Sequence, residues 1–373
     1  MPEIWIPYGD IEVSVDINTE NLLGIIKNQN KNIDIETIIE KIKKIKFNQT
    51  FMIILGDVST QTILICIELL KILDVEESIK KIQVYTIKKN KELQNSILKL
   101  NKINEIIYID NQVKKIIKEK IHSENIIFIS EASFNPLFGF NGGPITLAKI
   151  INDQLISEAF YNQELSLPNP GNNKIGHIIE KKYQEYNNIT SIELIAENND
   201  NIIEIEIGKL NNTHNLMKNI LNNNIKKSEK KFQSGIFSCD KKYNSSLARS
   251  LNGIWNTYTS FTEKSTITIL SESSDGFGSE ALQLFAINQL NLKDILKEKK
   301  YIDGLENIIF LNNLSESFFI NTITTLPNYY MEKRFKFRTF KKANDAVSSS
   351  IKRHGKSSQI VIIPQISNIL FIK

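Results

Sequence analysis

Apolar residues along the chain follow two patterns in turn, one typical of buried strands and one typical of helices. A continuous apolar run at 51–55, which ends in Gly56 and Asp57, is typical of a strand buried on both faces of a sheet. Ile63, Ile67 and Leu70 then recur at the spacing of one helix face. The same patterns predict further strands at 81–87, 106–109, 125–129, 235–238, 266–270, 307–311 and 359–364, and helices at 91–100, 113–121, 145–160, 246–258 and from Glu280. This alternation predicts an α/β fold with mainly parallel sheets.

Two hairpins and one polar stretch interrupt the alternation. Segments 4–6 and 12–15 flank a Gly-Asp turn, and segments 192–196 and 202–207 flank a polar turn, so each pair is expected to form an antiparallel hairpin. Residues 221–234 are polar, and the alternation restarts after them. We therefore expect two α/β domains, 1–228 and 229–373.

Composition narrows the class of protein. The 373 residues contain 46 Lys plus Arg and 42 Asp plus Glu, so the net charge is +4, too small an excess to indicate a nucleic-acid binder. A hydrophobic share of 41% and only two cysteines exclude disordered chains and disulfide scaffolds. The basic stretch 333–342 alternates with phenylalanines, as in a nucleic-acid stacking surface or an edge strand with one buried face. The weak overall charge favours the edge strand, and we expect no nucleic-acid partner.

No targeting or membrane segment is expected. Residues 1–8 lack the basic segment and long apolar stretch of a signal peptide, and the apolar run 63–73 is interrupted by Glu68 and Lys71. These features predict a cytoplasmic protein without a membrane partner.

The first of three glycine-containing loops is Gly56-Asp57-Val58-Ser59-Thr60, between a predicted strand and a predicted helix. Ligands of open α/β sheets bind at the carboxyl ends of the strands. Asp57 is therefore a candidate catalytic carboxylate, and Ser59 and Thr60 are candidate ligand-binding hydroxyls. Asp57 or Ser59 would also cap the following helix, and the two roles are compatible.

The second loop ends in Gly142-Gly143-Pro144 and opens the predicted helix 145–160. Glycines let backbone N–H groups approach a ligand, and a helix N-terminus favours an anion. Gly142 and Gly143 are thus candidate ligand-binding residues, although proline in a first helical turn is also an ordinary helix start. The loop contains neither the G-x-G-x-x-G pattern of dinucleotide binding nor a P-loop.

The third loop is 271–278, in which Glu272 and Asp275 are either acid–base groups or turn residues.

Histidine and cysteine offer little additional chemistry. The four histidines and the two cysteines show no metal-ligand spacing, so we expect no metal site. The histidines are His122, His177, His214 and His354, and the cysteines are Cys66 and Cys239.

Short motifs follow one another in order along the chain. They are Pro7-Tyr8-Gly9, 20–24, 56–60, 139–143, 275–278, 343–347, 354–355 and 361–364. This ordered set resembles the motifs P-Y-G, E-N-L-L-G, S-D-x-T-R, G-F-S-G-G, E-G-H-G and the C-terminal pattern of the nickel-pincer lactate racemase family. The resemblance implies two α/β domains with an active site in the cleft between them. In functional members it also implies a nickel pincer nucleotide, attached to a lysine, that accepts hydride from a 2-hydroxy acid.

Several family positions are changed in the first half of the chain. Ile145 occupies the position of the cofactor lysine, Asn135 that of an acid–base histidine, and Thr60 that of the motif arginine. The other catalytic histidine would fall near 84–87 and the nickel-ligating histidine near Tyr161, and neither place has a histidine. Isoleucine cannot form the covalent link, and asparagine cannot relay a proton near neutral pH.

In the second half, a family Gln and Lys one helical turn apart correspond to Arg249 and Asn252, while Asp57 of the first half persists. We therefore expect a cleft for a small 2-hydroxy acid or other carboxylate, no bound cofactor, and loss of the racemase chemistry. Whether any catalysis survives is left open. The alternative is a non-catalytic module that binds a small anion between the Gly142-Gly143 amides and Arg249. The candidate ligand-binding residues are Ser59, Thr60, Asn135, Gly142, Gly143, Arg249 and Asn252.

Overall fold

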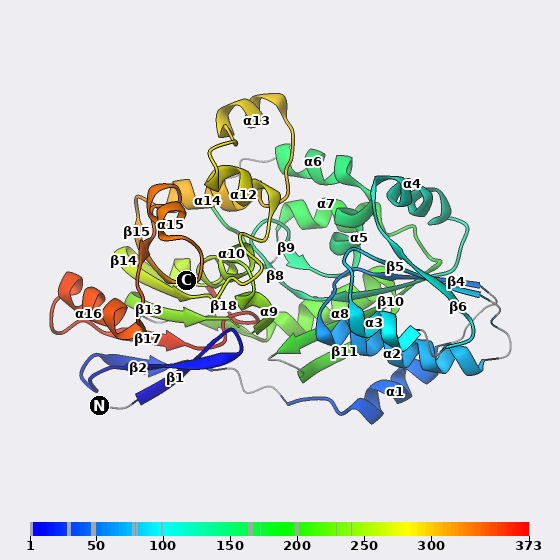
Figure 1. Ribbon diagram of the computed structural model, residues 1–373, viewed down its shortest axis with the longest axis horizontal. Helices are drawn as coiled ribbons and strands as arrows, with labels where there is room; N and C mark the ends of the chain where they lie inside the picture. The colour runs from blue at the N-terminus through cyan, green and yellow to red at the C-terminus, as the bar shows by residue number, and fades with distance from the viewer. Residues whose placement is uncertain are drawn as a thin grey trace.

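Two six-stranded sheets organise the protein (Figure 1). The computed structural model describes residues 3–27, 31–45, 50–76, 79, 81–97, 100–162, 167–171, 173–197, 201–228, 230–239 and 241–372. Both sheets are mainly parallel and are covered by helices, which confirms the predicted α/β class.

The first sheet has the strand order β11-β10-β7-β4-β5-β6. Its strands are β4 (Thr50–Leu55), β5 (Lys81–Thr86), β6 (Ile103–Tyr108), β7 (Ile126–Glu131), β10 (Ile189–Glu197) and β11 (Asn201–Lys209). Only β11 runs antiparallel, against β10, and this pair is the expected second hairpin. The loops that follow the carboxyl ends of the parallel strands therefore all lie at the same edge of the sheet.

Both faces of the first sheet are buried, which explains its continuous apolar runs. Ile53 and Leu55 of β4 face one core, while Met52 and Ile54 face the other, as the two-residue period of a strand requires. The Ile53 side is covered by α1 (Ile35–Lys43), α2 (Thr60–Val75) and α3 (Lys91–Ile97). The opposite side is covered by α4 (Asn111–Lys120), α5 (Gly143–Ile151), α7 (Lys174–Lys182) and α8 (Leu210–Asn222).

The second sheet is parallel throughout, with the order β16-β15-β14-β13-β17-β3. Its strands are β3 (Leu22–Ile25), β13 (Phe232–Ser238), β14 (Phe261–Leu270), β15 (Phe318–Ile323), β16 (Arg338–Thr339) and β17 (Ile360–Ile363). One face packs on α16 (Ala343–His354) and on the expected first hairpin, β1 (Glu3–Tyr8) with β2 (Ile11–Asp16). The other face packs on α12 (Glu280–Ala286) and α14 (Leu305–Leu314).

The two ends of the chain meet in the second half of the molecule. Leu22 of β3 pairs with Ile360 of β17, and Figure 1 shows the blue N-terminal strands beside the red C-terminal elements. The predicted division into 1–228 and 229–373 stays a prediction, and residue 229 lies outside the described residues. The sheets themselves divide the chain differently at its start, because β3 belongs to the second sheet.

The two halves are held together by further contacts. Strand β12 (Ile225–Lys227) pairs with β18 (Leu370–Ile372), so the C-terminal segment returns towards the first half. The Asn368 amide donates a hydrogen bond to the carbonyl oxygen of Ala196 at 2.7 Å. Helix α6 (Asp153–Tyr161) contacts the segment after α13 (Leu292–Glu298), where the Tyr161 hydroxyl donates to the carbonyl oxygen of Lys300 at 2.8 Å. A continuous apolar core therefore joins the two sheets.

Two predicted helices are interrupted. The predicted helix 145–160 is two helices, α5 and α6, because the Asn152 side chain accepts a hydrogen bond from the N–H of Leu155 and starts a new helix. The predicted helix 246–258 consists of α10 (Leu247–Ser250), α11 (Asn252–Trp255) and the 3₁₀ turn η2 (Tyr258–Ser260). A shorter helix, α9 (Lys241–Asn244), precedes them.

One predicted strand is wrong. Segment 307–311 lies inside helix α14, which is buried around nearly its whole circumference and so has the apolar run of a buried strand. The strand that follows is β15. In the basic stretch 333–342, Phe335 and Phe337 are buried after α15 (Asn328–Lys333), and β16 forms a sheet edge. These two rings are therefore part of the core.

The remaining features concern the two cysteines and the lengths of the helices. Cys66 and Cys239 are both buried and both free thiols. Within the described ranges, no helix is both long enough and apolar enough to cross a membrane.

Candidate functional site

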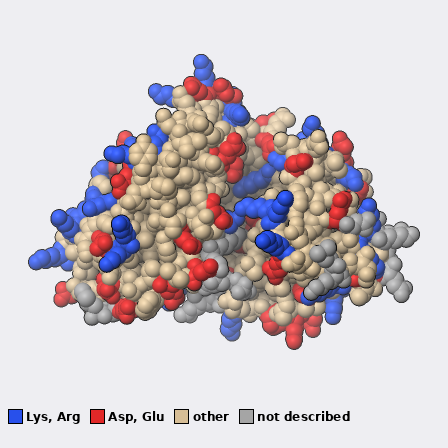
Figure 2. All heavy atoms as spheres, in the orientation of Figure 1, with Lys and Arg blue, Asp and Glu red and all other residues tan. Residues whose placement is uncertain are grey.

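A cavity of about 420 Å³ lies between the two halves of the molecule. Figure 2 shows a hollow there, where basic and acidic side chains meet. Gly56, Ile87 and Ile109 line it directly after β4, β5 and β6, so the cavity sits at the carboxyl ends of parallel strands. This is the position at which open α/β sheets bind ligands. The opposite wall comes from α10, α11, α14 and the loop before α12.

Only part of the first predicted loop, residues 56–60, faces the cavity. Asp57 lines the cavity, and its carboxylate accepts a hydrogen bond from the N–H of Glu131 at 3.2 Å. Ser59 does not line the cavity: it caps α2 and lies 3.1 Å from a carboxylate oxygen of Glu131. Thr60 is the exposed first residue of α2 and also does not line the cavity. The capping role therefore belongs to Ser59, and Asp57 is the residue of this loop that faces the cavity.

The hairpin of β8 (Ser133–Asn135) and β9 (Gly139–Asn141) supplies amides to the cavity. Asn135 accepts hydrogen bonds from two backbone N–H groups of its own turn and donates to the Asn141 side chain at 2.9 Å. Lys149 of α5 donates to the same Asn141 oxygen at 2.8 Å and lies over the Phe138 ring, 4.8 Å from its centroid. These contacts fix one amine at the wall of the cavity.

The Gly142-Gly143 turn lies behind this wall and does not line the cavity. The Gly142 N–H donates to the Thr146 hydroxyl and the Gly143 N–H to the Ser130 hydroxyl, each at 3.0 Å. Both glycines have positive φ, and a side chain at Gly142 would collide with Glu193. Glycine is therefore required here by backbone conformation and close packing, and the two amides are engaged inside the protein.

The second half contributes a guanidinium and an amide. Arg249 of α10 and Asn252 of α11, two of the candidate ligand-binding residues, both line the cavity. Lys114 of α4 also lines it and is 3.1 Å from Asp153, an ion pair at the cavity's outer edge. Arg249, Lys114 and Lys149 thus bring three cationic groups to one cavity.

A buried carboxyl group faces these cations. Glu306, at the start of α14, lines the cavity and is only 8% exposed. Its burial and the nearby Asp303 carboxylate raise its pKa to about 7. The Tyr301 hydroxyl donates to a Glu306 carboxylate oxygen at 3.2 Å. A carboxyl group with this pKa can exchange a proton near neutral pH.

Sequence reasoning missed Glu306, Lys149 and Lys114. Glu306 was hidden because the neighbouring segment was interpreted as a strand. Its only local signal is the helix start after Gly304, which has a positive φ. Lys149 lies one helical turn after Ile145, on the helix that the glycine loop opens.

The third predicted loop contributes little beyond its last residue. Gly278 and the following Ser279 line the cavity, whereas Glu272 and Asp275 do not. Ser279 caps α12, and the Asp275 N–H donates to the Ser245 carbonyl oxygen. Among the residues described, no group of three or more His, Cys, Asp or Glu side chains is arranged to hold a metal ion.

Fold and cavity together define a two-sheet α/β protein with a polar cleft between its halves, lined by both cationic and carboxyl side chains. No protein-family model matches the sequence, and no curated protein matches it. Among solved structures, the lactate racemase apoprotein from Thermoanaerobacterium thermosaccharolyticum is similar over 100% of both chains, with a TM-score of 0.78 and 14% sequence identity. A crystal structure of a Thermotoga maritima protein is similar over 90% of this chain and 96% of that one, with a TM-score of 0.62 and 10% identity. This chain therefore has a lactate racemase-like fold.

Proposed function

We propose that the protein binds a small carboxylate, of the 2-hydroxy acid class, in the cleft between its two sheets. The observation that supports this most directly is the convergence of Arg249, Lys114 and Lys149 on one cavity at the carboxyl ends of the first-sheet strands. A guanidinium pairs with a carboxylate through two parallel hydrogen bonds, which fixes the orientation of the acid as well as its charge. Asn252 and Asn135 can then accept or donate hydrogen bonds at the hydroxyl group.

We further propose that the protein works without a nickel pincer nucleotide. Ile145, at the position of the family's cofactor lysine, has no exposed surface and packs in the apolar core. The cavity lining, as far as the structure describes it, supplies carboxylates and amines but no imidazole. Such a donor set does not suit nickel, which favours imidazole and thiolate ligands in proteins. The same residues support binding without racemisation. We also propose that the protein acts in the cytoplasm.

Proton transfer is the chemistry that the cavity residues could still supply. Glu306 has a pKa near neutrality, and Asp57 lies in the same cavity. Both are side chains of this protein, so proton transfer by them would require no cofactor. Neither replaces the hydride acceptor that a nickel-pincer racemase uses, so we expect no interconversion of D- and L-lactate.

Calorimetric titration of the full chain with L-lactate, D-lactate and the neutral lactamide tests the proposal. Both acids should bind and lactamide should bind at least tenfold more weakly, because it lacks the carboxylate that Arg249 would hold. Arg249→Met should weaken acid binding by about tenfold to a hundredfold, the worth of a hydrogen-bonded charge pair. Equal binding of acid and amide, or no binding of either acid, would show that the cleft does not hold a carboxylate.

A matched pair of lysine variants separates the cleft from general surface charge. Lys114 lines the cavity, whereas Lys115, the next residue on α4, is exposed and does not. Lys114→Met should weaken lactate binding while Lys115→Met leaves it unchanged. Incubation with D-lactate or L-lactate, with and without added nickel pincer nucleotide, should give no racemisation and no retained nickel. Turnover in the presence of the nucleotide would overturn the cofactor part of the proposal.

A further inference from the structure

A second and larger cavity lies outside the cleft. Its volume is about 580 Å³, and none of its lining residues lines the cleft. Helix α7 supplies one wall and the β8–β9 hairpin another, with Lys218 of α8 at the far end. The size falls within the usual range of small-molecule sites.

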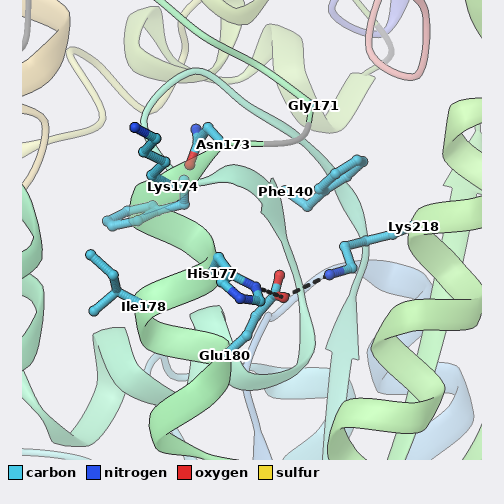
Figure 3. Close-up of a pocket in the computed structure, with 9 residues that line it drawn as sticks. Phe140, Gly171, Asn173, Lys174, His177, Ile178, Glu180 and Lys218 are labelled. Carbon is cyan, nitrogen blue, oxygen red and sulfur yellow. Dashed lines mark hydrogen bonds and ion pairs between the residues drawn. The ribbon is translucent and has the colours of Figure 1, made fainter.

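The walls of this cavity are largely apolar. Phe138 and Phe140 come from the hairpin, and Ile178 comes from α7. Figure 3 shows Phe140 and Ile178 on opposite sides of the space between them. Ile178 is 41% exposed, so part of its surface remains uncovered. An apolar ligand body placed here would bury that surface.

A chain of buried charges forms the base of the cavity. Glu180 lines it and is 2.7 Å from the amine of Lys218, and both side chains are only 14% exposed. Behind Glu180, the fully buried His214 ring has one nitrogen 3.6 Å from Glu180 and the other 2.8 Å from Glu193. The Nε2 atom of His214, which faces Glu180, makes no hydrogen bond within the described part of the chain.

This charge chain lies directly beside a cavity. Removing paired charges from water offsets much or all of their attraction, so a buried charge cluster beside a cavity is a candidate functional site as well as a structural one. Burial would raise the pKa of Glu180, but His214 and Lys218 outweigh that effect and hold it at about 2. Burial would lower the pKa of His214, but Glu193 and Glu180 raise it to about 9. The Glu180 carboxylate is thus charged at neutral pH and already matched by two cations, and the exposed His177 ring also lies 3.8 Å from it.

Lys174 supplies the unmatched charge. It lines the cavity on α7, is exposed, and forms no ion pair with any residue that the structure describes. Glu180, Lys218, His214 and Glu193 balance one another, so Lys174 leaves the cavity with one positive charge in excess. An apolar space with one excess cation is complementary to an apolar molecule that carries one anionic group.

We propose that this second cavity binds a small organic acid, with its apolar body against Phe140 and Ile178 and its carboxylate at Lys174. The site is independent of carboxylate binding in the cleft. It requires a ligand with an aromatic ring or branched chain, which distinguishes it from a three-carbon hydroxy acid.

Saturation-transfer NMR and calorimetry with 3-phenylpropionate on the full chain test this site, with the neutral 3-phenylpropionamide as the uncharged comparison. The acid should bind, and the amide should bind about fivefold more weakly, the effect of one partly exposed ion pair. Lys174→Met should weaken acid binding by the same factor. Lys181→Met is the matched control, because Lys181 is exposed on the same helix and does not line the cavity. Absence of acid binding, or equal binding of acid and amide, would overturn the proposal.

Two further variants locate the probe. Ile178→Asp places a carboxylate among the apolar walls on an exposed position, so it should abolish 3-phenylpropionate binding without unfolding the protein, as circular dichroism would verify. Arg249→Met in the cleft should leave 3-phenylpropionate binding unchanged while it weakens lactate binding. If Arg249→Met weakens 3-phenylpropionate binding as much as Lys174→Met does, the probe sits in the cleft and the second site is wrong. Loss of lactate binding alone would bear only on the cleft.

Discussion

Glu306 makes a quantitative test of the cavity's electrostatics possible. Its pKa is raised from 4.5 to about 7 by burial and by Asp303, so the folded protein holds this proton more tightly than the unfolded chain does. At 1.36 kcal/mol per pH unit, the difference corresponds to roughly 3 kcal/mol. Below pH 4.5 both states are protonated and there is no penalty. Between pH 4.5 and 7 the unfolded chain ionises first, so stability falls as the pH rises, and above pH 7 the full penalty applies.

Glu306→Gln removes this titration while keeping the shape of the side chain. The glutamine oxygen can still accept the Tyr301 hydroxyl, which lies 3.2 Å from Glu306. The variant should therefore be more stable than the wild type at pH 8, by up to about 3 kcal/mol, and should differ little near pH 4.5. Urea unfolding followed by circular dichroism at pH 4.5, 6 and 8 measures the difference.

Glu298→Gln serves as the control, because Glu298 is an exposed glutamate on α13. Its effect should be small and independent of pH. If the stability difference between Glu306→Gln and the wild type were the same at pH 4.5 and pH 8, the carboxyl group would not titrate as its surroundings require. The assignment of Glu306 as the cavity's proton-exchanging group would then be wrong.

Three further predictions concern the buried structure around the site. Gly142→Ala should destabilise the protein by about 2 kcal/mol or more in thermal unfolding, because the new Cβ would collide with a Glu193 oxygen and the backbone φ is +102°. Gly24→Ala, with no atom within 4 Å of the added Cβ, should be close to neutral. The pKa of His214, raised from 6.5 to about 9, stabilises the fold fully below pH 6.5, and this contribution is lost as the pH rises through 9. His214→Gln should therefore destabilise the protein by about 3 kcal/mol at pH 6 and by much less at pH 9.5, and equal losses at both pH values would contradict the buried ion pair. Burial raises the pKa of the Cys66 thiol to about 12, so neither buried thiol should react with Ellman's reagent at pH 8 until urea unfolds the chain, and prompt reaction of the native protein would contradict this packing.

The strands of the first sheet could be predicted because their sequence records burial on both faces. Strands β4 and β7 contain apolar runs that end in polar loops, and short runs of this kind between helices favour buried strands. Helix α14 was misread for the same reason. Its apolar residues surround the helix and form a continuous run, so periodicity gives no sign of helix or strand.

The candidate residues of the cavity came from the loop after a predicted strand and from the family resemblance. Of the candidate site residues, Asp57, Asn135, Arg249 and Asn252 line it, and their roles as catalytic or ligand-binding residues stay predictions. Lys114, Lys149 and Glu306 lie on three different helices, and only the folded chain brings them together. The pKa of Glu306 depends on Asp303 and on burial by distant segments, so no local pattern of residues could reveal it.

The pairing of β3 with β17 has a consequence for the order in which the protein is made. Residues 50–209 contain every strand of the first sheet, so this sheet can assemble as soon as that stretch has left the ribosome. Strand β3 is synthesised before all of them, yet Leu22 can pair with its partner, Ile360, only after that residue has been synthesised. Strand β3 is thus one of the first strands to emerge, whereas its partner strand is one of the last. A truncated chain that ends after Lys209 would keep a complete first sheet while leaving the edge of β3 open to other chains.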